Sequence, residues 1–327
     1  MNAPPTGTPR NPISTSTAPA EGALHKAKAW PGRRFHRLAP AAAALGALTA
    51  ALAPPETGRS ASWPAAAPRL GGETCAIGLA EAGRRNQAGM ATLAFAPFGR
   101  AETGWEIYAP LIAHEIGARC AGGSPAFARD LAAWQSAHGL RASGVIDEAT
   151  FAAMKNLWQA RRPFVTANRK GCPAPPDEAT LAPVPAAQSY GGKILWLRPP
   201  GLAAYQRMLA AARAEAPEVR ADRRLMTLFS AYRSPASDAA RCARDNDCQG
   251  ITRASCSAHR TGLAIDLDLG AAPGFGPDSS DDANRLAITR GAAYRWMVAN
   301  AGRFGFVNYA FEPWHWEWTG EPIRPES

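Results

Sequence analysis

Apolar and polar residues follow a helical spacing in the stretch from residue 124 to residue 161. Phe127, Leu131 and Trp134 recur at intervals of four and three, which places them on one side of a helix. Ser124 and Pro125 precede them, and this order is typical of an N-cap residue followed by proline at the first helical position. The pattern predicts a helix that begins near residue 125 and buries one face.

A second helix is predicted from Asp147 onward. The aspartate side chain is suited to cap the free amides of a first turn, and Ile146 and Phe151 occupy the two positions of a hydrophobic staple. Met154, Leu157 and Trp158 continue the buried side of this helix.

The last third of the chain mixes both periodicities. Residues 202–216 and 284–306 read as helices, the second of them long and ending at glycines, whereas residues 225–234 and 314–318 read as strands. Because helices and strands do not alternate regularly, we expect an α+β fold with an antiparallel sheet.

Composition shifts divide the chain further. Residues 38–53 form an apolar run behind a basic cluster, which is typical of a secretory signal and short for a membrane span. An uncleaved anchor and a buried alanine-rich helix are the alternatives. We predict a signal or anchor segment (1–53), a flexible linker (54–71), a helical domain (72–162), a proline-rich linker (163–190) and a further domain (191–322).

The basic charge does not indicate nucleic-acid binding. Residues 1–37 hold six basic side chains and one acidic one, and so supply +5 of the net charge of +9. No nucleic-acid-binding motif follows, so the charge is better explained by targeting and by attraction to anionic cell-wall polymers.

The chain contains six cysteines, an even number that favours disulfides in an exported protein. No C-x-x-C pair occurs, which argues against a cysteine zinc site. The pairing is left open, although the closeness of Cys242, Cys248 and Cys256 suggests that one loop is stapled locally.

The segment between the two predicted helices carries a recognisable motif, WQSAHGLRASGVIDEAT, at residues 134–150. It resembles the small three-helix peptidoglycan-binding module over about fifty residues. The matching positions are Trp134-Gln135, Gly139-Leu140, Gly144, Asp147 and Thr150. Most of them are structural, because the glycines suit tight turns and the aspartate suits a cap.

Beyond residue 164 the chain contains two histidines, His259 and His315, each close to carboxylates in sequence. Two imidazoles and one carboxylate would hold zinc with three protein ligands and leave a fourth position for water, as in catalytic sites. Calcium and magnesium prefer oxygen ligands.

The alternation from Leu263 to Leu269 places Asp266 and Asp268 on the same side of a strand. Asp266 is the candidate third ligand, and Asp268 a group behind it or beside the substrate. Glu312 is the candidate general base, but it shares a side with His315 only if Pro313 kinks the strand.

Glu317 has the same parity as His315 and is the alternative base. Trp314, Trp316 and Trp318 fall on the opposite side of this strand, where we expect core packing or a cleft wall.

Three motifs in this region carry a second resemblance. The segments SAYRS (230–234), SAHRTGLAID (257–266) and EPWH (312–315) follow in this order within about ninety residues. They resemble the signatures of the zinc D-alanyl-D-alanine carboxypeptidases of the VanY type, whose fold is related to those of lysostaphin and hedgehog. Two departures are a glutamate at position 317, where that family often has a basic residue, and the richer cysteine content.

The resemblance implies a role for each matching residue. His259, Asp266 and His315 would bind zinc, Glu312 would be the catalytic base, and Arg233 would stabilise negative charge on the substrate or oxyanion. Ser257 and Tyr232 would contribute to the substrate pocket. A surface salt bridge is the alternative interpretation of Arg233.

The sequence therefore predicts an exported, periplasmic or wall-associated zinc peptidase whose partner and substrate is peptidoglycan. Release of the terminal D-alanine from a stem peptide is the expected reaction. An endopeptidase that cuts L-Ala-D-Glu or a cross-link is one alternative, and a non-catalytic wall-binding protein with a structural zinc is another.

Overall fold

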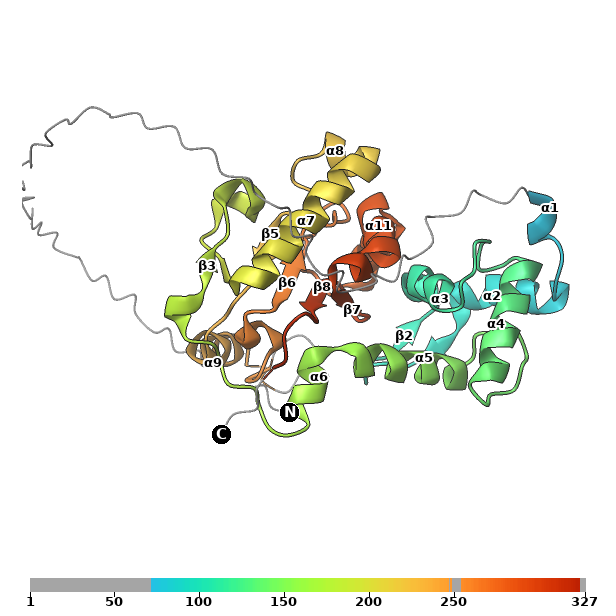
Figure 1. The fold of residues 1–327 in the computed structure, drawn as a ribbon. Coiled ribbons are helices and arrows are strands. Elements are labelled where there is room, and N and C mark those ends of the chain that lie inside the picture. The colour runs from blue at the N-terminus through green and yellow to red at the C-terminus, as the bar shows by residue number, and fades with distance from the viewer. Residues whose placement is uncertain (1–71, 247, 249–253, 324–327) are drawn as a thin grey trace, which may run out of the picture. The chain divides into compact units, whose positions relative to one another are not determined.

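The computed structural model describes residues 72–246, 248 and 254–323 (Figure 1). The expected signal or anchor segment (1–53) and the expected linker (54–71) lie outside these residues. None of the described helices is both long enough and apolar enough to cross a membrane.

The N-terminal part of the described chain, residues 72–161, is largely helical, with one two-stranded antiparallel sheet. Its elements are α1 (Gly72–Cys75), α2 (Ala80–Thr92), β1 (Ala94–Phe95), β2 (Glu102–Thr103), η1 (Glu106–Tyr108), α3 (Ala109–Glu115), α4 (Pro125–Ala137) and α5 (Glu148–Arg161). Both helices predicted in this region are present. Ser124 caps α4 by accepting from the Phe127 amide at 3.2 Å, and Asp147 caps α5 by accepting from the Thr150 amide at 2.8 Å.

A core of mainly aromatic and aliphatic side chains joins these helices. It includes Trp105, Tyr108, Phe127, Phe151 and Met154, all of which are fully buried or nearly so. Apolar side chains at helical spacing thus meet in one cluster, as the amphipathic pattern requires.

The side chain of Gln135 binds the residues of the turn between α4 and α5. Its side-chain amide donates to Val145 O at 3.0 Å and to Thr150 Oγ1 at 2.9 Å, and its carbonyl accepts from the Gly144 amide at 2.8 Å. Gly144 has a φ of +67°, and a Cβ there would lie 2.5 Å from Ala128 O. The conspicuous residues of this segment therefore hold a turn together.

We expect Gln135→Ala to lower the free energy of unfolding by about 3 kcal/mol, because it leaves buried polar groups without partners. Urea denaturation of the two proteins measures the difference. Gln206→Ala is the matched control, since within the described residues the Gln206 side chain makes one long hydrogen bond, to Gln188 Oε1 at 3.3 Å. Equal losses in the two variants would show that Gln135 does not stabilise the turn.

A connecting region follows α5 and contains short elements only. They are α6 (Pro163–Asn168), η2 (Glu178–Thr180), β3 (Ala182–Pro183), η3 (Ala186–Gln188), η4 (Tyr190–Gly192) and β4 (Trp196–Leu197). β3 pairs with β4 in a second two-stranded antiparallel sheet. The region is rich in proline, and it contacts elements that follow it in the chain.

The remaining residues form an α+β region. Its elements are α7 (Pro199–Glu215), α8 (Pro217–Ala221), β5 (Leu228–Ser230), α9 (Pro235–Asp245), η5 (Ala258–Thr261), β6 (Ala264–Leu267), α10 (Asp282–Arg290), α11 (Ala292–Asn300), η6 (Ala301–Phe304), β7 (Phe306–Tyr309) and β8 (Glu312–Trp318). The expected mixture of helices and small antiparallel sheets is confirmed.

The prediction of a single long helix over residues 284–306 is wrong. The chain leaves the helical conformation at Gly291, whose φ of −68° and ψ of 150° are extended, and α10 and α11 are separate. Asp281 begins α10 by accepting from the Ala283 amide at 2.9 Å. The apolar period continues across the break, which is why the pattern alone did not reveal it.

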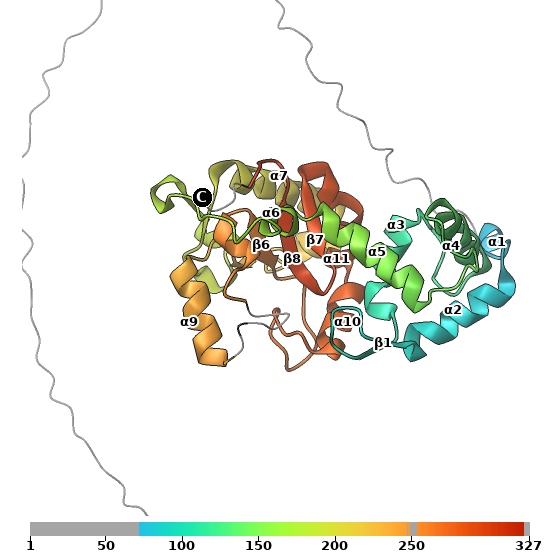
Figure 2. The same ribbon diagram turned by 90° about the horizontal axis from the view of Figure 1, so that it is seen from below.

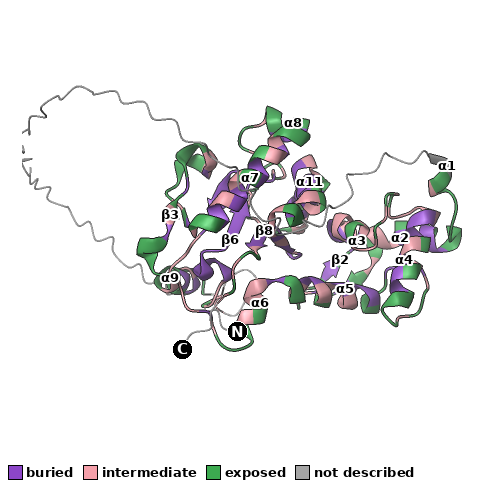
Figure 3. Ribbon diagram, viewed as in Figure 1, coloured by how far each residue is buried: buried purple, intermediate pink, exposed green. Residues whose placement is uncertain are grey.

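The four-stranded sheet has the order β5-β6-β8-β7, with antiparallel neighbours throughout. One face packs under α7 and α11, where Tyr205, Met208, Ile265, Trp316 and other side chains form a second core. Figure 3 shows the central strands β6 and β8 buried, and Figure 2 shows α7 and α11 against the same strands from a second direction. The side chains at the intervening strand positions point to the other face of the sheet.

Two disulfides tie distant parts of the chain together, Cys75–Cys120 and Cys172–Cys256. The closeness of Cys242, Cys248 and Cys256 suggested a local disulfide, but Cys256 does not pair with either of the other two. Its partner lies 84 residues earlier in the chain, because the connecting region runs beside the loop that precedes η5.

Candidate active site

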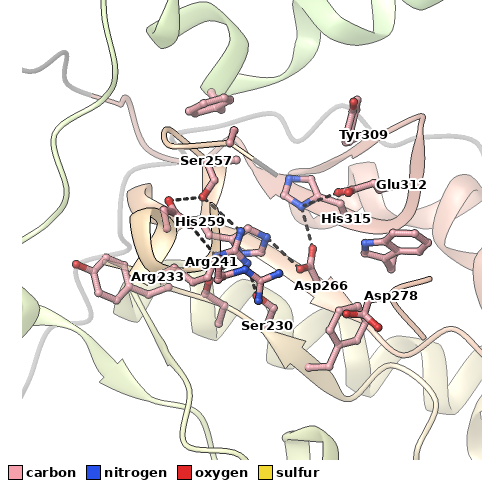
Figure 4. A pocket seen from close by; sticks show the side chains of 18 of the residues that line it. Ser230, Arg233, Arg241, Ser257, His259, Asp266, Asp278, Tyr309, Glu312 and His315 are labelled. Carbon is pink, nitrogen blue, oxygen red and sulfur yellow. Dashed lines mark hydrogen bonds and ion pairs between the residues drawn. The ribbon is translucent and has the colours of Figure 1, made fainter. Parts of the chain in front are cut away.

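A cavity of about 380 Å³ opens on the face of the sheet opposite α7 (Figure 4). Its wall includes most of the site residues expected from the sequence. They are Tyr232, Arg233, Ser257, His259, Asp266, Glu312 and His315.

His259 is held by the short helix η5 just before β6. Its Nδ1 lies 2.7 Å from the carbonyl oxygen of Ala231, so this nitrogen carries a proton that it donates. The chain then reverses at Gly262, which has a φ of +69° and caps η5 in the left-handed conformation that glycine adopts without strain. The free Nε2 of His259 is thereby turned toward β6 and lies 3.1 Å from Asp266 Oδ2.

Asp266 and His315 face each other across paired strands. They are register partners in β6 and β8, and His315 Nδ1 lies 2.9 Å from Asp266 Oδ1. Figure 4 shows the Asp266 carboxylate directed at both imidazoles. All three side chains are buried.

These three residues fit a zinc ion. One donor atom from each lies within 4.8 Å of the others. Tetrahedral zinc with ligands at 2.0–2.1 Å separates its donor atoms by about 3.3 Å. His259 Nε2 and His315 Nδ1 lie 3.1 Å and 2.9 Å from the oxygens of Asp266. The unprotonated His259 Nε2, His315 Nδ1 and a carboxylate oxygen of Asp266 would supply three ligands to such an ion, and the cavity would give a fourth position access to solvent.

Glu312 reaches the same site because β8 is irregular. Asn308 of β7 pairs with Trp316, but its neighbour Tyr309 pairs with Glu312, so the register shifts between them. Pro313 lies in the shifted segment, as the sequence predicted for a kink. The shift brings Glu312 Oε2 to 3.9 Å from His315 Nδ1, on the cavity side of the strand.

Residues 195–321 match the family VanY, D-alanyl-D-alanine carboxypeptidase. This part of the chain is a VanY domain.

Two solved structures are similar to it at low identity. One is the structure of the LdcB LD-carboxypeptidase, with 20% identity, a TM-score of 0.28 and coverage of 38% of this chain and 60% of that one. The other is a mutant of the vancomycin resistance D,D-pentapeptidase VanY in complex with Zn(II), with 21% identity, a TM-score of 0.24 and coverage of 42% and 83%. The chain thus spans less than two thirds of the first structure. A search of curated proteins finds no significant match.

Burial and charge set the protonation of the histidines in the VanY domain. Burial, helped by the charge of Arg233, lowers the pKa of His259 to about 4, so this imidazole is neutral at pH 7 and free to bind a metal. Burial also acts to lower the pKa of His315, but its contacts with Asp266 and Glu317 outweigh burial and raise the pKa to about 9.

The carboxylates of the VanY domain are shifted in opposite directions. Burial would raise the pKa of Asp266, but the two histidines outweigh it and lower that pKa. Burial raises the pKa of Glu312, and the charge of His315 opposes this only in part. A general base with a pKa nearer to neutrality both accepts and returns a proton readily.

Arg233 follows β5 and is fixed by two neighbours. Its Nε donates to Asp238 Oδ1 at 3.0 Å, and its Nη1 donates to Ser230 Oγ at 2.7 Å. Asp238 in turn accepts from Ser257 Oγ at 2.7 Å. Arg233 and Ser257 are therefore held in place by one buried carboxylate, with the guanidinium on the cavity wall.

The other expected site residues are placed differently. Tyr232 lines the cavity, and its hydroxyl donates to Glu178 Oε1 at 3.0 Å. Asp268 does not line it. It follows the end of β6, and its carboxylate accepts from the Gly270 amide at 3.0 Å.

Glu317, the alternative base, is not on the cavity wall. Only 3% of its side chain is exposed, and it lies on the far side of His315 from Asp266. Burial would raise its pKa, but Arg162 and His315 outweigh burial and lower the pKa to about 2. The geometry favours Glu312 as the group that reaches a substrate.

Two groups near the site were not found from the sequence. Asp238 is one of several aspartates on the described helices, and Arg162 precedes the VanY domain. Nothing in the local pattern of either distinguishes it from a surface residue, so their places follow from the fold alone.

Proposed function

We propose that this chain is an exported zinc metallopeptidase that hydrolyses peptidoglycan stem peptides and releases the terminal D-alanine. The convergence of His259, Asp266 and His315 in one cavity, inside a VanY domain, is the observation that carries the proposal. A structural metal site has no use for the open cavity beside it.

Zinc, when bound, would lower the pKa of a coordinated water toward neutrality and polarise the scissile carbonyl. Glu312 accepts the proton of the attacking water and passes it to the leaving amine. Its position 3.9 Å from His315 puts it beside the metal position, which such a transfer requires.

Arg233 supplies a fixed positive charge on the cavity wall. Its hydrogen bonds to Asp238 and Ser230 hold the guanidinium in one orientation, so little reorganisation is needed as negative charge develops on the substrate. Ser257 and Tyr232 line the same wall and offer hydroxyl groups to the peptide.

The helical region 72–162 is the proposed wall-binding part, and residues 191–322 the catalytic part. Binding to an insoluble polymer would raise the local concentration of the enzyme at its substrate. Periplasmic or wall-associated location is part of the proposal, and the two disulfides support it because they persist in oxidising compartments.

Product analysis on defined muropeptides tests the reaction. We expect mass spectrometry to show loss of a single alanine from an uncross-linked stem pentapeptide, with release of free D-alanine. Cleavage between L-alanine and D-glutamate, or of a cross-linked dimer only, would instead assign an endopeptidase. The Glu312→Gln protein, incubated in parallel, controls for a contaminating hydrolase.

A further inference from the structure

The strongest unexplained feature near the cavity is the buried ion pair between Glu317 and Arg162. Arg162 donates to Glu317 Oε1 from Nε at 2.7 Å, and its Nη2 lies 2.6 Å from the same oxygen. The exposed fractions of the two side chains are 3% for Glu317 and 8% for Arg162. A buried pair of this kind carries a large desolvation cost, so it is poor evidence for stability alone.

The second oxygen of Glu317 is also occupied. It accepts from the backbone amide of Phe164 at 3.0 Å, just beyond Arg162. The carboxylate is therefore fixed in orientation by a side chain and a backbone group that both precede the VanY domain.

Glu317 faces His315 from the side away from the metal position. The two residues are two positions apart on β8, so both point to the same face of the sheet. His315 Nε2 lies 3.5 Å from Glu317 Oε1. Within the described residues, this buried nitrogen has no partner at ordinary hydrogen-bond geometry. The closest carboxylate to it is the one that Arg162 holds.

A metal-bound imidazole requires a contact of this kind. If His315 binds through Nδ1, its remaining proton must sit on Nε2, which then becomes a donor that needs an acceptor. Ligating histidines commonly donate this second N–H to a carboxylate, which fixes the ring and raises its basicity. Glu317 is in the place for that acceptor.

Arg162 is itself anchored. Its guanidinium lies 4.0 Å from the centre of the Tyr309 ring, and its Nη1 donates to Gln159 Oε1 at 3.0 Å. Tyr309 lines the cavity and packs edge-on against His315. The end of α5 thus reaches the wall of the metal site.

We propose that Glu317 is a positioning residue for the metal ligand His315, and that Arg162 completes the site from outside the VanY domain by holding Glu317. This inference rests on the proposed zinc site. It implies that residues 195–321 without the preceding segment lack part of the support of their metal ligand.

Zinc affinity of the full chain, measured by competition with a chelator, tests this. We expect Glu317→Gln to weaken zinc binding by about 10- to 100-fold, the range typical of lost outer partners of a metal ligand. Arg162→Gln should weaken it by about tenfold, and the double variant should be no weaker than Glu317→Gln alone, because Arg162 acts through Glu317.

Arg161→Gln is the matched control. Arg161 is the neighbouring residue and pairs with Glu115 at 2.6 Å, away from the cavity. We expect its zinc affinity to equal that of the unchanged chain. Melting temperatures of the zinc-free proteins, measured alongside, separate a change in the metal site from a general loss of stability.

The outcomes are distinct. If the unchanged chain binds no zinc, the proposed function fails. If the unchanged chain binds zinc and a folded Glu317→Gln protein keeps the same zinc affinity, only the positioning role of Glu317 fails. If the losses of zinc affinity in the two single variants add up in the double variant, the role of Arg162 is refuted. If Glu317→Gln does not fold, Arg162→Lys takes its place, since it keeps the charge but not the two-pronged contact, and unchanged zinc affinity in that protein would overturn the inference.

Discussion

Replacing Glu312 with glutamine is expected to lower the rate of stem-pentapeptide hydrolysis by about 10²- to 10⁴-fold, the usual contribution of a general base. The amide has nearly the shape of the carboxylate but accepts no proton from water at neutral pH. Zinc content should not change, because Glu312 is not among the three proposed ligands. Released D-alanine and bound zinc, measured on the same preparation, check both statements.

Glu218→Gln is the matched control for this substitution, since Glu218 is exposed on α8. Its turnover should equal that of the unchanged chain. Unaltered turnover in Glu312→Gln would refute the mechanism, because Glu317 does not line the cavity. Absence of hydrolysis by the unchanged chain, with zinc bound, would support a non-catalytic wall-binding protein instead.

Removal of the metal is expected to have the largest effect. Dialysis against a chelator should reduce hydrolysis by about 10³-fold or more, because a catalytic metal contributes several kcal/mol to the transition state and each 1.36 kcal/mol is a factor of ten. Added zinc should restore the rate. The melting temperature should fall on chelation and recover with zinc, since an ion that binds only the folded chain stabilises it.

His259→Ala separates the loss of the metal from side effects of the chelator. This variant lacks one of the three proposed ligands, so zinc should neither bind at normal affinity nor restore activity. His114→Ala, at an exposed position in α3, is the control and should behave as the unchanged chain. Full activity after complete removal of zinc would exclude a zinc-dependent mechanism.

Local sequence signals were sufficient wherever the physics is local. Ser124 and Asp147 cap helices because the side-chain oxygen of each accepts from an amide three residues later, and both helices begin where these residues predict. Pro313 predicted an irregular strand for the same reason, because a missing amide interrupts the ladder wherever the residue stands. The strand alternation placed Asp266 on the cavity wall, whereas Asp268 does not line the cavity.

Errors arose where a distant part of the chain decides. The helix expected over residues 284–306 breaks at Gly291, although its apolar spacing continues, because the packing of α10 and α11 determines where the chain turns. Cys256 bonds with Cys172 and not with its near neighbours, because the connecting region lies against it. The spacing of apolar residues indicates which face of a helix or strand is buried, but not which other part of the chain covers that face.

The amino-acid sequence by itself determined the kind of chemistry: two histidines and a carboxylate in recognisable motifs, with Glu312 and Arg233 nearby. Residue types and short spacings carry that information, since donor atoms and turns are properties of the local chain. Tertiary structure alone decided which groups support them, through Asp238 behind Arg233 and through Glu317 and Arg162 behind His315. These partners come from separate segments, and only the folded sheet and the end of α5 bring their charges within contact of the site.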